Sequence, residues 1–211
     1  MKKSLLTFLG GVALVLIVWG IVALTNGKKQ EKNDEVPVSA EFVFENVVSA
    51  DKEYMSLNYG KKYLWYESTI LLANFLDEEN DGKIESVLDV FQVVIPVNET
   101  DTDTQVVLIN HTEDGSDVDV EHGLWFGDFV LLDEEIKLTF EEAFARLNES
   151  NYPKPHSRYC VLRKEIGPNP SNPQYIFGNT HVQLYVDAVT GDVSDESPAF
   201  KGFNIPKPVC E

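Results

Sequence analysis

The stretch 138–150, LTFEEAFARLNES, decides the fold class. Thr139 and Glu142 have the spacing of a capping box, in which the two side chains satisfy the first free amides of a helix. Apolar residues then recur at helical spacing, namely Phe140, Ala143, Phe144 and Leu147. The stretch therefore predicts a short amphipathic helix that begins after Thr139 and ends at 148–152, before Pro153.

Short strands are expected after this helix. Three segments have the alternation and β-branched or aromatic content of strands: 158–164, 175–177 and 181–187. Residues 167–173, GPNPSNP, read as a loop, and 187–193, DAVTGDV, as a turn. Gly191 would supply the positive φ that such turns often need. The helix therefore belongs to a unit of mixed α and β structure.

Apolar runs before the helix predict a second group of strands. They are 63–76, 87–97, 104–110 and 124–132. The pattern alone leaves a helix open for 63–76, although its aromatic and β-branched residues favour a strand. The fold class is therefore α+β: an antiparallel sheet followed by a helix packed on a small antiparallel sheet, all preceded by one N-terminal transmembrane helix.

The expected organisation has four parts. They are a membrane anchor at 1–27, a polar stalk at 28–36, an antiparallel β-rich subdomain at 37–133, and an α+β subdomain with a C-terminal tail at 134–211. The stalk is charged and has no periodicity, which is typical of a flexible linker.

The segment from about 137 to 193 resembles a PepSY domain. The resemblance depends on the helix opening Leu138–Ala143 (LTFEEA) and on the closing turn Tyr185–Val193 (YVDAVTGDV). It implies a helix across a small antiparallel sheet. It also implies a binding or inhibitory module, since PepSY units occur in propeptides of secreted metallopeptidases and in membrane-anchored envelope proteins. The first half, 36–132, resembles no family that we recognise.

The charge of the chain is strongly acidic. All 35 acidic residues and 15 of the 17 basic residues follow Gly27, so that part has a formal net charge of −20. Such a surface repels nucleic acid and anionic headgroups. Nucleic acid is therefore excluded as the main partner, whereas solubility, cations and basic proteins suit this charge.

Leu5–Leu24 predicts a membrane-spanning helix. The segment has 20 residues and no charged side chain, and a helix of that length spans roughly 30 Å, the thickness of the bilayer core. A cleaved signal peptide is the competing interpretation, but its apolar region is usually shorter, and the best cleavage site, near Ala23, is poor. Flanking lysines are nearly balanced. We expect the C-terminal part on the extracytoplasmic side because a short charged start followed by an apolar run is the usual export signal.

The two cysteines, Cys160 and Cys210, predict one disulfide. Neither belongs to a CxxC pair, and outside the cytoplasm two such residues favour pairing. The bond would close a loop of about 50 residues, worth on the order of 4 kcal/mol in the chain-entropy model. Two unrelated thiols are the alternative.

Two acidic stretches could bind a cation. Residues 77–85 begin like a calcium loop, but Leu88 stands where the twelfth position needs a glutamate. Residues 111–122 contain two histidines and several carboxylates without a known ligand spacing. For the first an acidic turn is favoured, and for the second an acidic solvated loop.

No catalytic motif marks a reaction, and no catalytic residue, metal ligand or cofactor is assigned. The sequence has no GxSxG, GxGxxG or P-loop. Four aromatic residues could form a sugar-stacking platform, but core packing explains them better: Trp65, Tyr66, Trp125 and Phe126.

The function that these features favour is a non-enzymatic, membrane-anchored, extracytoplasmic binding module. Its ligand is expected to be a peptidase or another envelope protein. Two alternatives are an extracytoplasmic hydrolase that uses carboxylates or a metal, and a structural subunit of a membrane complex held through Leu5–Leu24.

Overall fold

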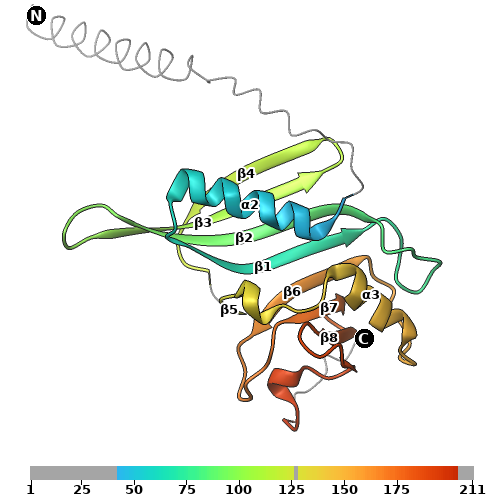
Figure 1. Ribbon diagram of the computed structural model, residues 1–211. Helices are drawn as coiled ribbons and strands as arrows, with labels where there is room; N and C mark the ends of the chain where they lie inside the picture. The colour runs from blue at the N-terminus through green and yellow to red at the C-terminus, as the bar shows by residue number, and fades with distance from the viewer. Residues whose placement is uncertain (1–41, 126–127, 204–211) are drawn as a thin grey trace, which may run out of the picture. The chain divides into compact units, whose positions relative to one another are not determined.

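Two helices pack on one face of an antiparallel sheet (Figure 1). The computed structural model describes residues 42–125 and 128–203, within a compact unit that begins at Val38. The strand order is β4-β3-β2-β1-β6-β7-β8-β9, and β5 pairs with β6 off this path. The elements are α2 (Phe44–Tyr59), β1 (Tyr63–Leu72), β2 (Ile84–Pro96), β3 (Thr102–Thr112), β4 (Gly115–His122), β5 (Asp128–Phe129), η1 (Asp133–Glu135), α3 (Phe140–Glu149), β6 (Tyr159–Glu165), β7 (Gln174–Gly178), β8 (Gln183–Asp187), β9 (Val193–Ser194) and η2 (Pro198–Phe200).

The same arrangement of a helix followed by four antiparallel strands occurs twice. α2 precedes β1–β4, and α3 precedes β6–β9. The first strand of each group lies at the centre of the sheet, where β1 and β6 pair antiparallel from Glu67↔Arg163 to Leu71↔Tyr159. The boundary expected between 133 and 134 thus separates the two groups in sequence, while their strands form one sheet.

The α+β class and most of the expected strands are confirmed. The run at 63–76 contains β1, so the helical alternative for it is wrong. The runs at 87–97 and 104–110 lie in β2 and β3, and the three segments after the helix lie in β6, β7 and β8. The loop at 167–173 is also confirmed.

Three elements differ from expectation. Helix α2 was not predicted. The stretch 111–122, expected as an acidic loop, instead forms the end of β3, a tight hairpin and β4. Within the described part, the run 124–132, expected as a strand, forms only the two-residue β5. Its other described residues belong to the connection from β4 to α3.

The expected helix start and closing turn are both present. The Thr139 side chain accepts from the amide of Glu142, and Glu142 accepts from the amide of Thr139 at 2.8 Å, which completes the capping box. In the closing turn the Asp187 side chain accepts from the amides of Val189 and Thr190 at 2.8 and 2.9 Å. Gly191 has φ +78°, as the turn requires.

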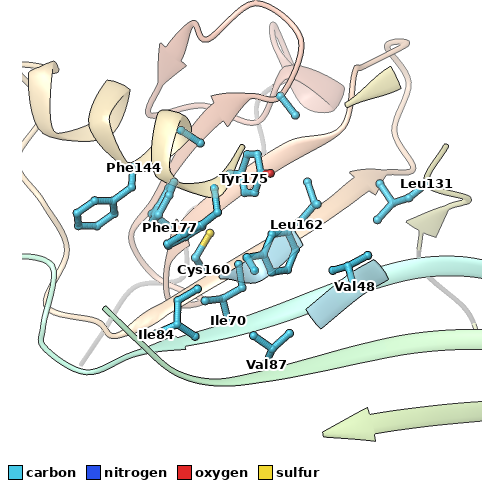
Figure 2. Close-up of a cluster of buried hydrophobic side chains, with 14 of the residues drawn as sticks. Val48, Ile70, Ile84, Val87, Leu131, Phe144, Cys160, Leu162, Tyr175 and Phe177 are labelled. Atoms are coloured by element: carbon cyan, nitrogen blue, oxygen red, sulfur yellow. The ribbon is translucent and has the colours of Figure 1, made fainter. Parts of the chain in front are cut away.

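One hydrophobic core lies between the helices and the sheet (Figure 2). It contains residues from both helix–sheet groups, such as Val48 of α2 and Phe144 of α3. Cys160 of β6 lies inside it, beside Ile70 and Phe177 on the neighbouring strands. Because both groups contribute to one core, each is stabilised by the other.

Several expected features fall outside the described residues. Leu5–Leu24 and the stalk at 28–36 are among them, and so is Cys210. Across 42–125 and 128–203, no helix combines the length and apolarity needed to cross a membrane. The anchor and the disulfide between Cys160 and Cys210 stay predictions.

The burial of Cys160 makes its thiol unreactive in the folded protein. Its side chain is fully buried, and this burial raises its pKa well above the usual value, which suppresses the nucleophilic thiolate. We expect Cys160 in the reduced, folded chain to react with iodoacetamide only at the rate of unfolding. Peptide mapping after timed alkylation measures this, and rapid labelling in native buffer would contradict the burial.

The same reagent tests the disulfide. In the unreduced chain, unfolded in guanidinium, we expect neither Cys160 nor Cys210 to be alkylated, and both to be alkylated after reduction. Two labelled cysteines without reductant would show that the pair is not bonded.

Candidate functional site

A surface groove lies at the N-terminal ends of α2 and α3. Its volume is about 790 Å³. Three separate parts of the chain and one hairpin residue line it: the start of α2, the turn before β2, the start of α3, and Glu113. We call it the acidic groove; its lining residues are Phe42, Val43, Phe44, Glu45, Asp81, Gly82, Lys83, Ile84, Glu113, Thr139, Phe140, Glu141 and Phe144.

Phenylalanine rings form the base of the acidic groove. The rings of Phe44 and Phe140 are 6.2 Å apart between centroids, and those of Phe140 and Phe144 are 6.0 Å apart. These three rings are largely buried, whereas Phe42 is half-buried and Val43 is 42 % exposed. The groove therefore offers an apolar surface at Phe42 and Val43 above an aromatic cluster.

A hydrogen bond across the base joins the two helices. The Glu45 carboxylate in the first turn of α2 accepts from the amide of Phe140, the first residue of α3, at 2.7 Å. This amide is one of the four that a helix start leaves without an intrahelical partner. Glu45 thereby fixes the distance between the helix starts and the width of the groove.

The turn at 77–85 forms one wall. Its acidic and amide side chains fold the turn itself: Asn80 accepts from the amide of Gly82 at 2.8 Å, and Asp81 accepts from that of Lys83 at 3.0 Å. Asp77 Oδ1 lies 3.0 Å from His156 Nδ1, within hydrogen-bonding distance. Among the described residues, no group of three or more His, Cys, Asp or Glu side chains is arranged to hold a metal ion.

Gly82 is required at this wall by conformation and by space. Its φ is +79°, and a Cβ there would lie 2.9 Å from the Phe144 ring. We expect Gly82→Ala to lower the free energy of unfolding by about 1–2 kcal/mol for the left-handed backbone, plus the cost of moving Phe144. Chemical denaturation measures this.

Gly202→Ala is the control for that substitution. Gly202 also has a positive φ, +85°, in a turn closed by the hydrogen bond from the Phe203 amide to the Phe200 carbonyl, but nothing lies within 4 Å of its Cβ position. If Gly82→Ala lowers the free energy of unfolding no more than Gly202→Ala does, the contact with Phe144 adds nothing to the cost.

The histidines of the stretch 111–122 have different partners and do not form one site. His111 Nε2 lies 2.6 Å from Asp51 Oδ1 beneath α2, while His122 Nδ1 lies 3.1 Å from Asp103 Oδ1 at the surface. The hydrogen bond from His122 lowers the pKa of Asp103. Only Glu113 of this stretch lines the acidic groove.

A buried carboxyl pair lies beneath α2. Asp51 of α2 and Asp89 of β2 are both almost fully buried, and Asp51 lies near enough to Asp89 to affect its pKa. Burial raises the pKa of Asp89 well above its usual range, and the neighbouring Asp51 raises it further. One oxygen of each carboxyl group has no donor within the described structure.

A bulge in β1 brings Ser68 to this pair. The register of β1 against β2 shifts between Trp65 and Glu67, so Trp65 and Ser68 both point into the core. Trp65 Nε1 donates to Ser68 Oγ at 3.2 Å, and Ser68 Oγ donates to Asp89. Hydrogen bonds therefore reach the carboxyl pair from two sides, from Ser68 to Asp89 and between His111 and Asp51.

A second carboxyl cluster lies on the opposite face of the sheet. Glu67, Asp128 and Glu165 surround Arg163; its Nη2 lies 3.0 Å from Glu165 Oε1, and its Nε lies 3.8 Å from Asp128 Oδ1. Burial is the largest cause of the raised pKa values of Glu67 and Asp128. The charge of Asp128 raises the pKa of Glu67 further, the charge of Glu165 raises that of Asp128, and the guanidinium of Arg163 lowers both. The cluster joins β1, β5 and β6.

The aromatic residues do not form a stacking platform within the described structure. Trp65 lies in the core, with the Lys52 ammonium 3.7 Å from its ring centroid. The Trp125 amide donates to Gln92, which points to the other face of β2, at 3.0 Å. Tyr66 is half-buried, and Phe126 lies outside the described residues.

Comparison with known proteins found no matching family model, no matching curated protein and no matching solved structure.

Proposed function

We propose that the chain is a membrane-anchored, extracytoplasmic binding module that engages a protein of the cell envelope through the acidic groove. The observation that carries the proposal is the groove itself, with Val43 exposed above a base of phenylalanine rings. A concave surface with an apolar base and a few polar groups is the usual form of a recognition site.

Two sequence features support this function. The PepSY resemblance at 137–193 includes α3, whose first residues line the groove. Leu5–Leu24 would hold the module at the membrane, which restricts its partners to proteins of the envelope. In this proposal a secreted or membrane peptidase is one such partner.

Site-specific photo-crosslinking tests the proposal in native membranes. A benzophenone amino acid replaces Val43 in the full-length chain, and in a control it replaces Leu57, which is 77 % exposed near the other end of the same helix. We expect one defined segment of one envelope protein to be cross-linked from position 43 and not from 57. No product, or the same products from both positions, would contradict the proposal.

The carboxyl cluster around Arg163 supports a second candidate, a carboxylate-dependent hydrolase. Glu67 is half-buried beside Asp128, and the pKa values of both are raised. A raised pKa is what a carboxyl group needs to act as a general acid. Hydrolytic activity on glycoside or peptide substrates that is abolished by Glu67→Gln, without loss of folding, would establish this function. Activity unchanged in that variant would exclude the cluster as its source.

A further inference from the structure

We propose that the segment bound in the acidic groove is a basic peptide with a bulky apolar anchor, whose lysine or arginine side chains face the rim while an aromatic or branched aliphatic side chain rests on Phe42 and Val43. This inference rests on the proposed function and names the chemistry of the partner.

The charge of the rim carries the first part of the argument. Four carboxylates line the groove, from Glu45, Asp81, Glu113 and Glu141, against the single ammonium group of Lys83. They come from four places in the sequence, so the concentration of negative charge results from the fold. A cationic segment is therefore attracted and an anionic one repelled.

Most of these carboxylates are free to meet a ligand. Glu113 pairs only loosely with Lys83, at 3.8 Å, and both side chains are more than half exposed, which makes the pair weak. Glu141 and Asp81 are exposed, and neither has an ion-pair partner among the residues that the structure describes. Two of the four already accept a backbone hydrogen bond, Glu45 from the amide of Phe140 and Asp81 from the amide of Lys83.

The apolar base carries the second part. Charge alone would suit any cation, but Phe42 and Val43 add partly exposed apolar surface to the same groove. An apolar side chain gains free energy by leaving water there, and a guanidinium or ammonium group can also lie over the Phe42 ring. A ligand that alternates basic and apolar residues satisfies both features.

A second copy of the chain does not have this chemistry. Its part after Gly27 has a net charge of −20, so two copies repel each other at close range. The partner is therefore expected to be a different protein, with a basic exposed segment.

Binding of designed peptides to the full-length chain in neutral detergent tests the inference. The probe is a fluorescent peptide of alternating Lys with Phe and Leu. One comparison peptide has Glu for every Lys, and another has Ser for every Phe and Leu. We expect the first to bind, with affinity reduced roughly tenfold or more by 0.5 M salt, and the other two to bind much more weakly.

Two charge variants separate the groove from the general acidity of the protein. Glu113→Gln with Glu141→Gln removes two charges from the rim, and Asp117→Asn with Asp119→Asn removes two exposed charges from β4. We expect the first pair to weaken binding by about tenfold and the second by less than about twofold. Thermal unfolding confirms that all variants are folded.

Three results would overturn the inference: equal weakening of binding by both pairs of substitutions, equal affinity for the Glu or Ser peptide, or no binding of the basic peptide.

Failure of this inference is distinguishable from failure of the proposed function. An acidic or uncharged partner segment cross-linked from position 43 keeps the function and overturns the basic ligand. Specific peptide binding without any cross-link from position 43 keeps the ligand chemistry and overturns the envelope partner. A cross-linked dimer of the chain would overturn both.

Discussion

Asp89→Asn is expected to stabilise the protein at neutral pH and to remove part of the pH dependence of its stability. Asp89 is fully buried, and its pKa is raised by burial and by the neighbouring Asp51. An asparagine has nearly the same shape and no charge. Its amide group can donate to Asp51 while its oxygen accepts from Ser68, so both contacts of Asp89 are kept.

The direction of the effect follows from proton linkage. The pKa of Asp89 is higher in the folded protein than the ordinary 3.8. The folded state therefore holds more protons than the unfolded state from about pH 4 up to the raised pKa. The contribution of Asp89 to the free energy of unfolding is therefore fully present below this range. It falls as the pH rises through the range, by as much as about 1.4 kcal/mol per pH unit. Asn at this position does not titrate, so its advantage grows with pH.

Urea unfolding of both proteins at several values between pH 4 and 8 measures this difference. The other buried acids, Glu67 and Asp128, are present in both proteins, so their contributions cancel. Asp119→Asn removes a charge from the exposed strand β4 and should change stability by less than about 0.5 kcal/mol at every pH. Parallel curves for the original protein and Asp89→Asn would show that Asp89 is ionised in the folded state at all these pH values.

This carboxyl pair also explains why α2 could not be predicted. Its buried residues are Phe44, Val48, Asp51 and Met55, so a charged residue interrupts the apolar stripe, and the N-cap residue Val43 makes no side-chain bond. Helix α3 has an unbroken stripe and a capping box, and its prediction was confirmed. An aspartate normally marks an exposed position, but Asp51 is buried next to Asp89 of β2. No local sequence pattern reveals this neighbour.

Strand β4 and the run 124–132 show the same limit for strands. β4 is an edge strand, and the acidic residues that alternate with its valines are typical both of a solvated loop and of a protected sheet edge. From the run 124–132, Leu131 is buried in the core, and its amide donates to the Trp65 carbonyl of β1 at 2.8 Å. Apolarity indicates burial, not the partner that provides it.

The acidic groove could be anticipated only in part. Residues 77–85 and 111–122 stand out in the sequence as acidic, and both contribute to the rim through Asp81 and Glu113. That these two stretches meet the starts of two helices depends on the pairing of β1 with β6, which is a long-range contact without a sequence signature. The residues of the groove are therefore known only from the fold.

Leu184→Ala is expected to destabilise the whole described unit, including the strands farthest from the substitution in sequence. Leu184 lies in β8 and is 2 % exposed within the common core. Removing a buried leucine side chain costs about 2–5 kcal/mol, through lost burial and the cavity left behind. This is a large part of the 5–15 kcal/mol that is typical of a domain.

The tryptophans make the extent of this effect measurable. Beyond the predicted anchor the only ones are Trp65 and Trp125, both in the sequence before 133. Trp65 is buried in β1, which β6 and β7 separate from β8. If the two helix–sheet groups fold as one unit, the urea midpoint from tryptophan fluorescence must shift as far as the midpoint from far-UV circular dichroism.

Val182→Ala is the control, because Val182 precedes β8 and is 50 % exposed; it should change stability by less than about 0.5 kcal/mol. An unchanged tryptophan midpoint in Leu184→Ala, with a shifted dichroism midpoint, would mean that 37–133 folds without the second group. The single core and the central pairing of β1 with β6 argue for the other outcome. If one group unfolded while the other stayed folded, the folded group would expose the unpaired edge of β1 or β6 and its half of the core. We therefore expect a single unfolding transition.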